Sequence, residues 1–278
     1  MAWPLASITP NVEEALDSFR QRCQTLLTQL DQCQTPHRIE LPFTGGLIGY
    51  LTYELNTLVQ ATDVEGLASA TVGLYDWALI TDHQLQHCWL MCHPSMPTQR
   101  SDELLALFTT APTTASTAPF RLTSVFEPRI TAQRYYDAGD CYQVNYTQRF
   151  SSHYQGDPWQ AYISLRQQCP TPFASFIRVN DKQAIVSLSP ERFIQVRQRH
   201  VESRPIKGTR ARAVAALEDQ ALADDLLASA KDRSENLMIV DLLRNDLGRY
   251  CSTGSIRVPE LFALESYPNV HHMVSSVT

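Results

Sequence analysis

Residues 231–247 read KDRSENLMIVDLLRNDL, and this stretch decides how the second half of the chain is organised. It predicts the last part of a long helical stretch over about 213–247, broken near Ala230. Short runs rich in β-branched, aromatic and apolar residues predict strands before and after this helix. Those runs are 142–154, 173–179, 183–189, 193–198, 201–206, 255–258, 262–266 and 269–277. The expected order in this half of the chain is therefore strands, then the helical stretch, then strands again.

Elements upstream of this region carry clear start and stop signals. Asp157-Pro158 predicts the beginning of a helix that ends near Cys169. Near the N-terminus, Asn11 followed by Glu14 is typical of a capping box and predicts a helix over 11–31. Strands are expected at 45–53, 72–80 and 86–92, the last two as a hairpin, with a short helix at 101–108. The small, proline-containing stretch 109–119 predicts a domain boundary between 1–118 and 119–278.

Composition excludes several classes of function. The chain has 278 residues, 23 Lys plus Arg, 29 Asp plus Glu and a formal net charge of −6, so we expect no nucleic-acid partner. No apolar run approaches the roughly 20 residues that span a bilayer, so we expect no membrane association and a cytoplasmic protein. The 7 cysteines are an odd number without regular spacing, which fits a reducing compartment without disulfides.

Three polar clusters in the second half could carry chemistry, and each has a plainer alternative. Glu191 lies between two expected strands, where burial could keep it partly protonated as a general acid; an ion pair with Arg192 is the alternative. Lys207 precedes a glycine and has Arg204 and Arg210 nearby, which would favour an uncharged, nucleophilic amine; a solvated hairpin lysine is the alternative.

The third cluster is a pair of acids. Asp232 and Glu235 stand at i and i+3, so their carboxylates share a helix face and could hold Mg²⁺; they could equally complement the helix dipole. The histidines and cysteines of 82–93 suggest zinc, but strand alternation sends them to opposite faces and accounts for the pattern. His271 and His272 are adjacent, so at most one can point into a given pocket.

Six motifs, taken in order, resemble those of the chorismate-utilising enzymes, and among them most closely the aminodeoxychorismate synthase component I family of p-aminobenzoate and folate biosynthesis. The resemblance runs from about residue 40 to the last residue. The motifs are FTGGLIGY at 43–50, AGDCYQVN at 138–145 with QRF at 148–150, SPERF at 189–193, PIKGT at 205–209, KDR with ENLMIVDLLRNDL at 231–247, and YPNVHHMVS at 267–275.

The resemblance implies an α+β fold in which two antiparallel β-sheets pack face to face with helices outside, and chorismate and Mg²⁺ lie between them. Residues 1–118 would be part of the N-terminal region that resembles anthranilate synthase component I. Residues 119–278 would be the first part of the chorismate-binding domain.

The resemblance also implies a role for each site residue. Glu191 would be the acid near the departing C4 hydroxyl, and His272 a histidine of the catalytic pocket. Glu235 would be a magnesium ligand with Asp232 assisting. Gly208, Thr209 and Gln143 would line the substrate site, Gln143 standing where isochorismate and salicylate synthases carry a water-activating lysine.

Lys207 distinguishes between branches of the family, because the anthranilate-forming relatives usually carry alanine there. The implied reaction is attack of Lys207 at C2 of chorismate, loss of the C4 hydroxyl, and displacement of the lysine by ammonia at C4. A glutamine amidotransferase subunit would supply the ammonia.

Two departures from the family pattern lead to a further expectation. Residues 131–137 replace a longer helix, and the family continues well past the equivalent of Thr278 with a second magnesium-ligating glutamate. We therefore expect an incomplete pair of sheets at the C-terminus and no turnover by these 278 residues alone. The alternatives are an enzyme like anthranilate synthase component I, or a noncatalytic remnant or binding module of the family.

Overall fold

The computed structural model describes residues 4–11, 14–30, 41–52, 55, 67–110, 119–124, 127–129 and 149–278. The chain divides into two compact units, the first comprising 1–116 and 179–183 and the second 117–178 and 184–278. Within the described residues, no helix has both the length and the apolar character that crossing a bilayer requires. The mixture of helices and antiparallel strands confirms the expected α+β class. Most of the expected boundary and the first part of the expected strand at 142–154 lie outside the described residues.

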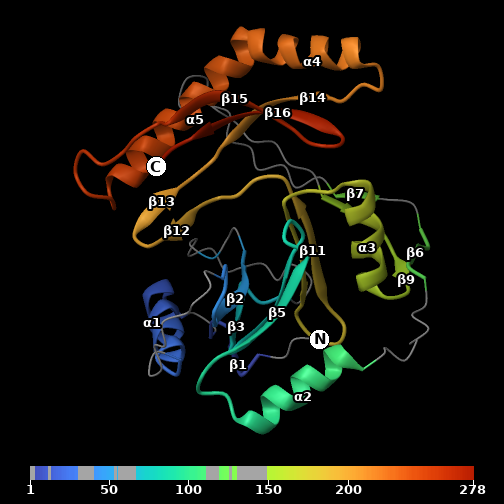
Figure 1. The fold of residues 1–278 in the computed structure, drawn as a ribbon, viewed down its shortest axis with the longest axis vertical. Helices are drawn as coiled ribbons and strands as arrows, with labels where there is room; N and C mark the ends of the chain where they lie inside the picture. Colours follow the sequence, from blue (N-terminus) through green and yellow to red (C-terminus); the bar gives the residue numbers. More distant parts are fainter. Residues whose placement is uncertain are drawn as a thin grey trace. The chain divides into compact units, whose positions relative to one another are not determined.

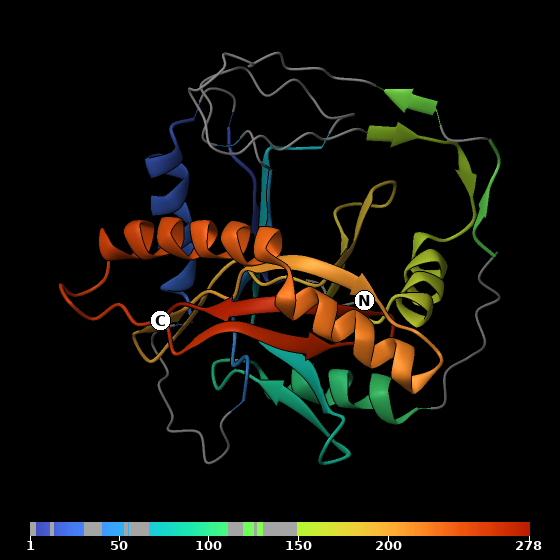
Figure 2. The same ribbon diagram turned by 90° about the horizontal axis from the view of Figure 1, so that it is seen from above.

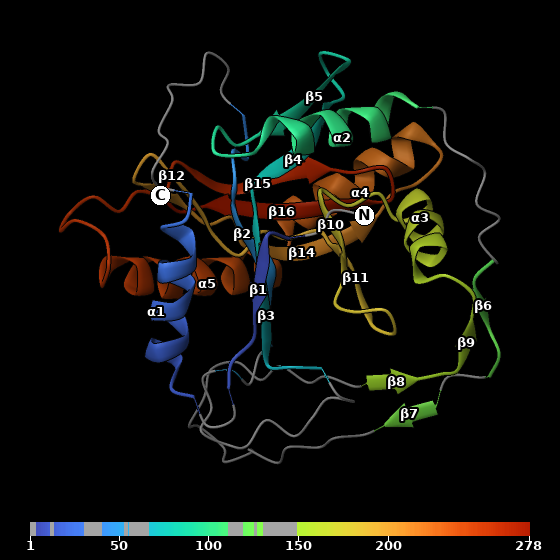
Figure 3. The same cartoon turned by 90° about the horizontal axis from the view of Figure 1, so that it is seen from below.

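The first unit is built on a three-stranded antiparallel sheet with a helix against it (Figure 3). The strand order is β1-β3-β2, and helix α1 packs on the sheet through Phe19, Leu26 and residues next to them. The helix begins later than expected: the Glu14 carboxylate does accept the Asn11 N–H at 2.9 Å, but both residues precede the helix, which starts at Leu16. The bounds are β1 Ala6–Ile8, α1 Leu16–Leu27, β2 Gly46–Leu51 and β3 Ala70–Tyr75.

A buried acid divides the strand expected at 72–80. Asp76 is 3% exposed and lies 3.3 Å from Arg100 of helix α2 (Thr98–Thr109), so the chain breaks there into β3 and β4 (Trp77–Asp82). The expected hairpin of β4 with β5 (His87–Cys92) is confirmed, with Trp77 opposite Cys92.

The second unit begins with paired short strands and a capped helix. Strand β6 (Arg121–Leu122) pairs with β9 (Tyr154–Gln155), and β7 (Glu127–Arg129) pairs with β8 (Arg149–Ser151). Helix α3 (Pro158–Gln168) starts as expected, because the Asp157 carboxylate accepts the Trp159 N–H at 3.0 Å. Two hairpins follow, β10 (Phe173–Arg178) with β11 (Ala184–Ser189) and β12 (Gln195–Arg197) with β13 (His200–Glu202).

A three-stranded antiparallel sheet covered by two helices forms the rest of the second unit (Figures 1 and 2). Its order is β14 (Ile206–Ala211), β16 (Val270–Ser276) and β15 (Glu260–Ser266), and helices α4 (Ala216–Ala228) and α5 (Ala230–Gly248) lie along one face. The break expected near Ala230 is confirmed: it falls at Ser229, whose hydroxyl accepts the Asp232 N–H at 3.3 Å and caps α5.

Two of the strand predictions in this region were wrong. Residues 255–258 form a loop in which Arg257 exchanges two backbone hydrogen bonds with Thr278, at 2.7 and 2.9 Å, instead of a regular strand. Strand β14 was not expected as an element of its own, because its sequence IKGTRA lacks a clean alternation. The strand expected at 201–206 ends at Glu202.

Both outer strands of this sheet contain a bulge. On β14, Ile206 lies opposite Val274 and Thr209 opposite His272, so one extra residue is accommodated across Lys207 and Gly208. On β15, the same shift occurs between Glu260 and Ala263. The two irregularities flank the same part of β16.

Candidate active site

Gly208 brings the bulge of β14 against the helical layer. Its φ is +90°, and a Cβ built there would lie 2.9 Å from Cδ1 of Leu226 and 3.0 Å from Cβ of Asp232. A side chain would therefore suffer both an unfavourable backbone conformation and a clash. The glycine expected to contact substrate is required here by packing against α4 and α5.

Lys207 faces a carboxylate rather than the cations expected around it. Its Nζ lies 4.0 Å from Oε1 of Glu235, and the two side chains are 29% and 36% exposed. Arg210 is paired with Asp225 at 2.7 Å and with Asp232 at 3.2 Å. The hydrogen bond with Asp225 is the largest of the effects that raise the pKa of Arg210.

Arg204, the second cation expected near Lys207, is also neutralised. Its guanidinium lies 2.7 Å from Glu265 and 3.2 Å from Glu260. In the described contacts, both cations expected beside Lys207 are therefore paired with carboxylates. Lys207 remains a candidate nucleophile because of its position and the family resemblance.

Glu191 is exposed, which corrects the expectation of burial. Its Oε1 accepts the backbone N–H of Ile206 at 3.0 Å, and the Ser189 hydroxyl accepts the Glu191 N–H at 3.2 Å. The alternative ion pair with Arg192 does not describe this site, because Arg192 pairs with Glu202. The Glu191 carboxylate is thereby hydrogen-bonded to the residue that precedes Lys207.

His272 is buried, at 7% exposure, and lies directly opposite Thr209 in the sheet. Its Nδ1 is 2.9 Å from the Thr209 hydroxyl. Burial lowers the pKa of His272, while the charges of Glu265 and Glu191 act in the opposite direction. The folded protein therefore favours the neutral imidazole, which can donate one hydrogen bond and accept another.

A small cavity of about 190 Å³ lies beside His272. It is lined by His272, Tyr267, Pro190, Leu188 and 169–172, with further residues of the turn between β15 and β16. Typical ligand pockets occupy roughly 300–1,000 Å³, so the cavity is smaller than a usual small-molecule site. It places Pro190, the neighbour of Glu191, and His272 on one concave surface.

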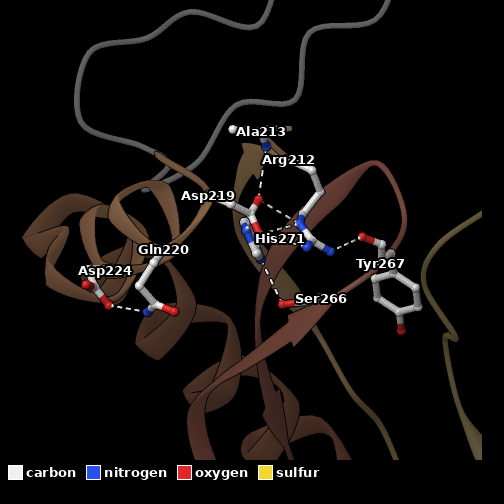
Figure 4. A network of polar contacts seen from close by, with 8 residues as sticks. All are labelled: Arg212, Ala213, Asp219, Gln220, Asp224, Ser266, Tyr267 and His271. Atoms are coloured by element: carbon white, nitrogen blue, oxygen red, sulfur yellow. Dashed lines mark hydrogen bonds and ion pairs between the residues drawn. The ribbon is translucent and has the colours of Figure 1, made fainter. Parts of the chain in front are cut away.

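His271 points away from that cavity into a polar network on the helical side (Figure 4). Its Nε2 lies 3.1 Å from Asp219 and its Nδ1 lies 2.8 Å from the Ser266 hydroxyl. Arg212 donates two hydrogen bonds of 2.7 Å to Asp219 and holds the pKa of that carboxyl well below its usual range. The adjacent histidines thus face opposite sides, as expected, and the network attaches α4 to the sheet.

The two acids of α5 that the sequence suggested as metal ligands lie on the helix side that faces β14. Asp232 and Glu235 occupy the first two turns of the helix, and each is engaged by a cation of β14. Among the residues that the structure describes, no group of three histidine, cysteine or carboxylate side chains is arranged to hold a metal ion. Mg²⁺ commonly binds one or two protein carboxylates and completes its shell with water and substrate, so this donor pair fits Mg²⁺.

The predicted site residues therefore fall into two connected groups. One contains Lys207, Gly208, Asp232 and Glu235, where β14 meets α5, and the other contains Glu191, Thr209 and His272. Gln143 lies outside the described residues. Asn236 was missed as part of the site's framework: it is fully buried although the sequence marks it only as one polar residue in a helical run.

Comparison with known proteins identifies the family. Residues 5–278 match the model of the chorismate binding enzymes. Aminodeoxychorismate synthase component 1 of Klebsiella aerogenes is 45% identical over 269 residues, which are 90% of this chain and 58% of that protein. The protein of the same name from Escherichia coli is 41% identical over 278 residues, 94% of this chain and 59% of that protein. The chain thus spans about three fifths of the length of these relatives.

Solved structures show the same fold at low sequence identity. Anthranilate synthase component I from Streptococcus pneumoniae superposes with a TM-score of 0.69 at 22% identity, covering 99% of this chain and 67% of that one. The isochorismate synthase MenF from Escherichia coli gives a TM-score of 0.59 at 13% identity, covering 99% and 60%. From the motifs, the fold and the match over 5–278, the chain belongs to the chorismate binding enzyme family.

Proposed function

We propose that the chain carries the C4 amination site of an aminodeoxychorismate synthase component 1, acting in p-aminobenzoate and folate biosynthesis. The observation that carries this proposal is the setting of Lys207, an amine at the bulge of β14 with a carboxylate, Glu191, hydrogen-bonded to the preceding residue at 3.0 Å. A nucleophile and an acid are thereby held by adjacent residues of one strand. The names of the two relatives described above support the same activity.

In the proposed reaction, the Lys207 amine bonds to C2 of chorismate, the ring double bonds shift, and the C4–O bond breaks. Glu191 gives its proton to the departing hydroxyl, which leaves as water. Ammonia then bonds to C4, the double bonds shift back, and Lys207 leaves as a free amine. The new C4 ammonium returns a proton to Glu191. Each turnover replaces a hydroxyl by an amino group and keeps the enolpyruvyl group.

Thr209, His272 and Gly208 would position the substrate. The Thr209 hydroxyl and the neutral His272 imidazole offer hydrogen bonds on one side of the sheet. Gly208, where a side chain would meet Leu226 and Asp232, would contact the substrate through its backbone. Gln143 is proposed for the same site. Glu235 and Asp232 would hold Mg²⁺, which when bound would supply positive charge to the carboxylates of chorismate.

A glutamine amidotransferase subunit is the proposed source of ammonia. The name that both relatives carry, component 1, supports the existence of a second component. Ammonia reaching C4 directly from a partner would avoid its protonation in water, since ammonium carries no lone pair for the attack.

Replacement of the nucleophile tests the proposal. In a polypeptide that extends this chain to the length of its relatives, Lys207→Ala should abolish p-aminobenzoate formation in an assay with ammonia, Mg²⁺ and excess lyase, whereas Lys182→Ala, in an exposed turn, should leave it unchanged. Incubation with chorismate without ammonia should add the substrate's mass, less water, to the peptide containing Lys207. Wild-type turnover by Lys207→Ala would overturn the assignment.

The alternatives give different products in the same assay. An enzyme like anthranilate synthase component I would form anthranilate, and Lys207 would then be dispensable. A noncatalytic module would bind chorismate without forming either amine. The lysine between Ile206 and Gly208 favours aminodeoxychorismate over both.

A further inference from the structure

Asn236 connects helix α5 to the central strand of the sheet. It is 0% exposed and follows Glu235 directly in the sequence. Its Oδ1 accepts a hydrogen bond from the Ser275 hydroxyl at 2.6 Å, and its Nδ2 donates to the Met273 carbonyl at 3.3 Å. Both ends of the amide are therefore used by alternate residues of β16.

The two residues of β16 that Asn236 contacts lie opposite the bulges of the two outer strands. The extra residue of β14 is accommodated opposite Met273, between the pairs formed by Val274 and His272. The extra residue of β15 is accommodated opposite Ser275, between the pairs formed by Ser276 and Val274. One buried amide thus spans the positions at which both outer strands leave their regular register.

The bulge of β15 is joined to the same network. The Phe262 N–H donates to the Ser275 hydroxyl at 3.1 Å, and Phe262 has a φ of +60°, which a non-glycine residue rarely adopts. The Arg233 guanidinium lies 4.8 Å from the centre of the Phe262 ring. Helix α5 therefore contacts this bulge through Arg233 and, by way of Ser275, through Asn236.

The bulge of β14 fixes the other side of the helix. Gly208 packs against Asp232, and Arg210 pairs with the same carboxylate at 3.2 Å. Asp232 and Glu235 thus belong to two helical turns that contact both bulges. A carboxamide has a donor end and an acceptor end, so a rotation or shift of α5 would leave both Asn236 and its strand partners unsatisfied.

We propose that Asn236 and Ser275 are positioning residues that hold the Glu235 carboxylate in the geometry needed for a divalent cation. This inference rests on the proposed function, in which Glu235 is a metal ligand. Residues that hold metal ligands in place are themselves worth about 10–100-fold in metal affinity. Since Asn236 acts on Glu235 through the helix backbone, an effect at the lower end of that range is expected.

The test measures metal affinity rather than activity. Mn²⁺, which takes the same oxygen ligands, is titrated into the 278-residue chain with chorismate present, and the dissociation constant is read from water proton relaxation. Ser275→Ala should weaken Mn²⁺ binding about tenfold. Ser203→Ala is the matched control, because Ser203 is also buried and donates one hydrogen bond, to the Phe193 carbonyl at 2.7 Å. Ser203→Ala should lose about as much thermal stability as Ser275→Ala but leave the dissociation constant for Mn²⁺ unchanged.

An exposed residue provides a variant that should fold normally. Arg233→Lys keeps the positive charge but loses the flat guanidinium over Phe262, and should weaken Mn²⁺ binding about two- to threefold. Arg244→Lys, further along α5 in an exposed pair with Asp241, should not. Equal affinities for Arg233→Lys, Ser275→Ala and wild type would overturn the inference.

Glu235→Gln distinguishes failure of the positioning role from failure of the proposed metal assignment. If Glu235→Gln weakens Mn²⁺ binding while Ser275→Ala does not, the metal assignment stands and the positioning role is refuted. If Glu235→Gln binds Mn²⁺ as the wild type does, or the wild type binds none, the metal assignment fails and the positioning role fails with it.

Discussion

Gly208→Ala tests whether packing at the bulge of β14 is as tight as the structure shows. The added methyl would lie 2.9 Å from Cδ1 of Leu226, and 3.0 and 3.1 Å from Cβ and Cγ of Asp232. These separations are well below ordinary carbon contacts of about 3.5–4.0 Å. Either the neighbouring side chains or the backbone must therefore shift. Asp232 lies in the first turn of α5, next to its cap.

Two costs combine in this substitution. Placing a non-glycine residue at a φ of +90° costs roughly 1–2 kcal/mol. Forcing an extra methyl into a packed site costs typically about 1–3 kcal/mol. We therefore expect a loss of about 2–5 kcal/mol in the free energy of unfolding. For a unit of this size each kcal/mol lowers the Tm by roughly 2–4 °C, so the fall should be on the order of 10 °C.

Two other glycines separate these costs. Gly254 has a φ of +76° but open space around its Cβ position, so Gly254→Ala should show the backbone cost alone. Gly248 has open space and no positive φ and ends α5, so Gly248→Ala should be neutral or stabilising by up to about 1 kcal/mol. The measurement is urea and thermal unfolding followed by circular dichroism. A Gly208→Ala protein no less stable than Gly254→Ala would refute the close packing of β14 on the helices.

Three further predictions concern charge and capping. Asp219→Asn should destabilise the protein at pH 7. The difference in unfolding free energy between variant and wild type should shrink as pH falls below about 3.9, because Arg212 lowers the folded pKa of Asp219 and the carboxylate's contribution is lost on protonation. Urea unfolding from pH 7 to 2.5 measures this difference, and a larger difference in acid would contradict the prediction. The His272 ring should titrate below about 6.5 by NMR, with stability falling as pH drops below that value, since burial lowers its pKa. Asp157→Ala should cost about 1 kcal/mol through loss of the α3 cap, seen as a lower urea midpoint.

Local chemistry made several elements of the fold predictable. Asp157-Pro158 marked the start of α3, the runs 173–179 and 183–189 marked the strands β10 and β11, and the break between α4 and α5 fell within a residue of Ala230. In each case the signal lies in residues adjacent along the chain. Such signals survive folding because the groups that satisfy them are also adjacent.

Features that depend on distant residues could not be found in this way. The division at Asp76 depends on Arg100 of another element, and the bulge at Lys207 and Gly208 depends on register with β16. The same holds for the site: the sequence identified the candidate residues, but not that Lys207 faces Glu235. Ion pairs and register across a sheet are set by tertiary contacts that no local pattern encodes.

The central position of β16 has a consequence for synthesis of the chain. Its neighbour β14 is made first, and α4, α5 and β15 all emerge from the ribosome before β16 does. The described pairings join β14 to β16 and β15 to β16, so a nascent chain paused before Val270 presents two strands whose shared partner has not yet been made. Unpaired edges of this kind invite association with other chains. Synthesis of the last motif is therefore the step that supplies β14 and β15 with their shared partner and covers the two strand edges that face it.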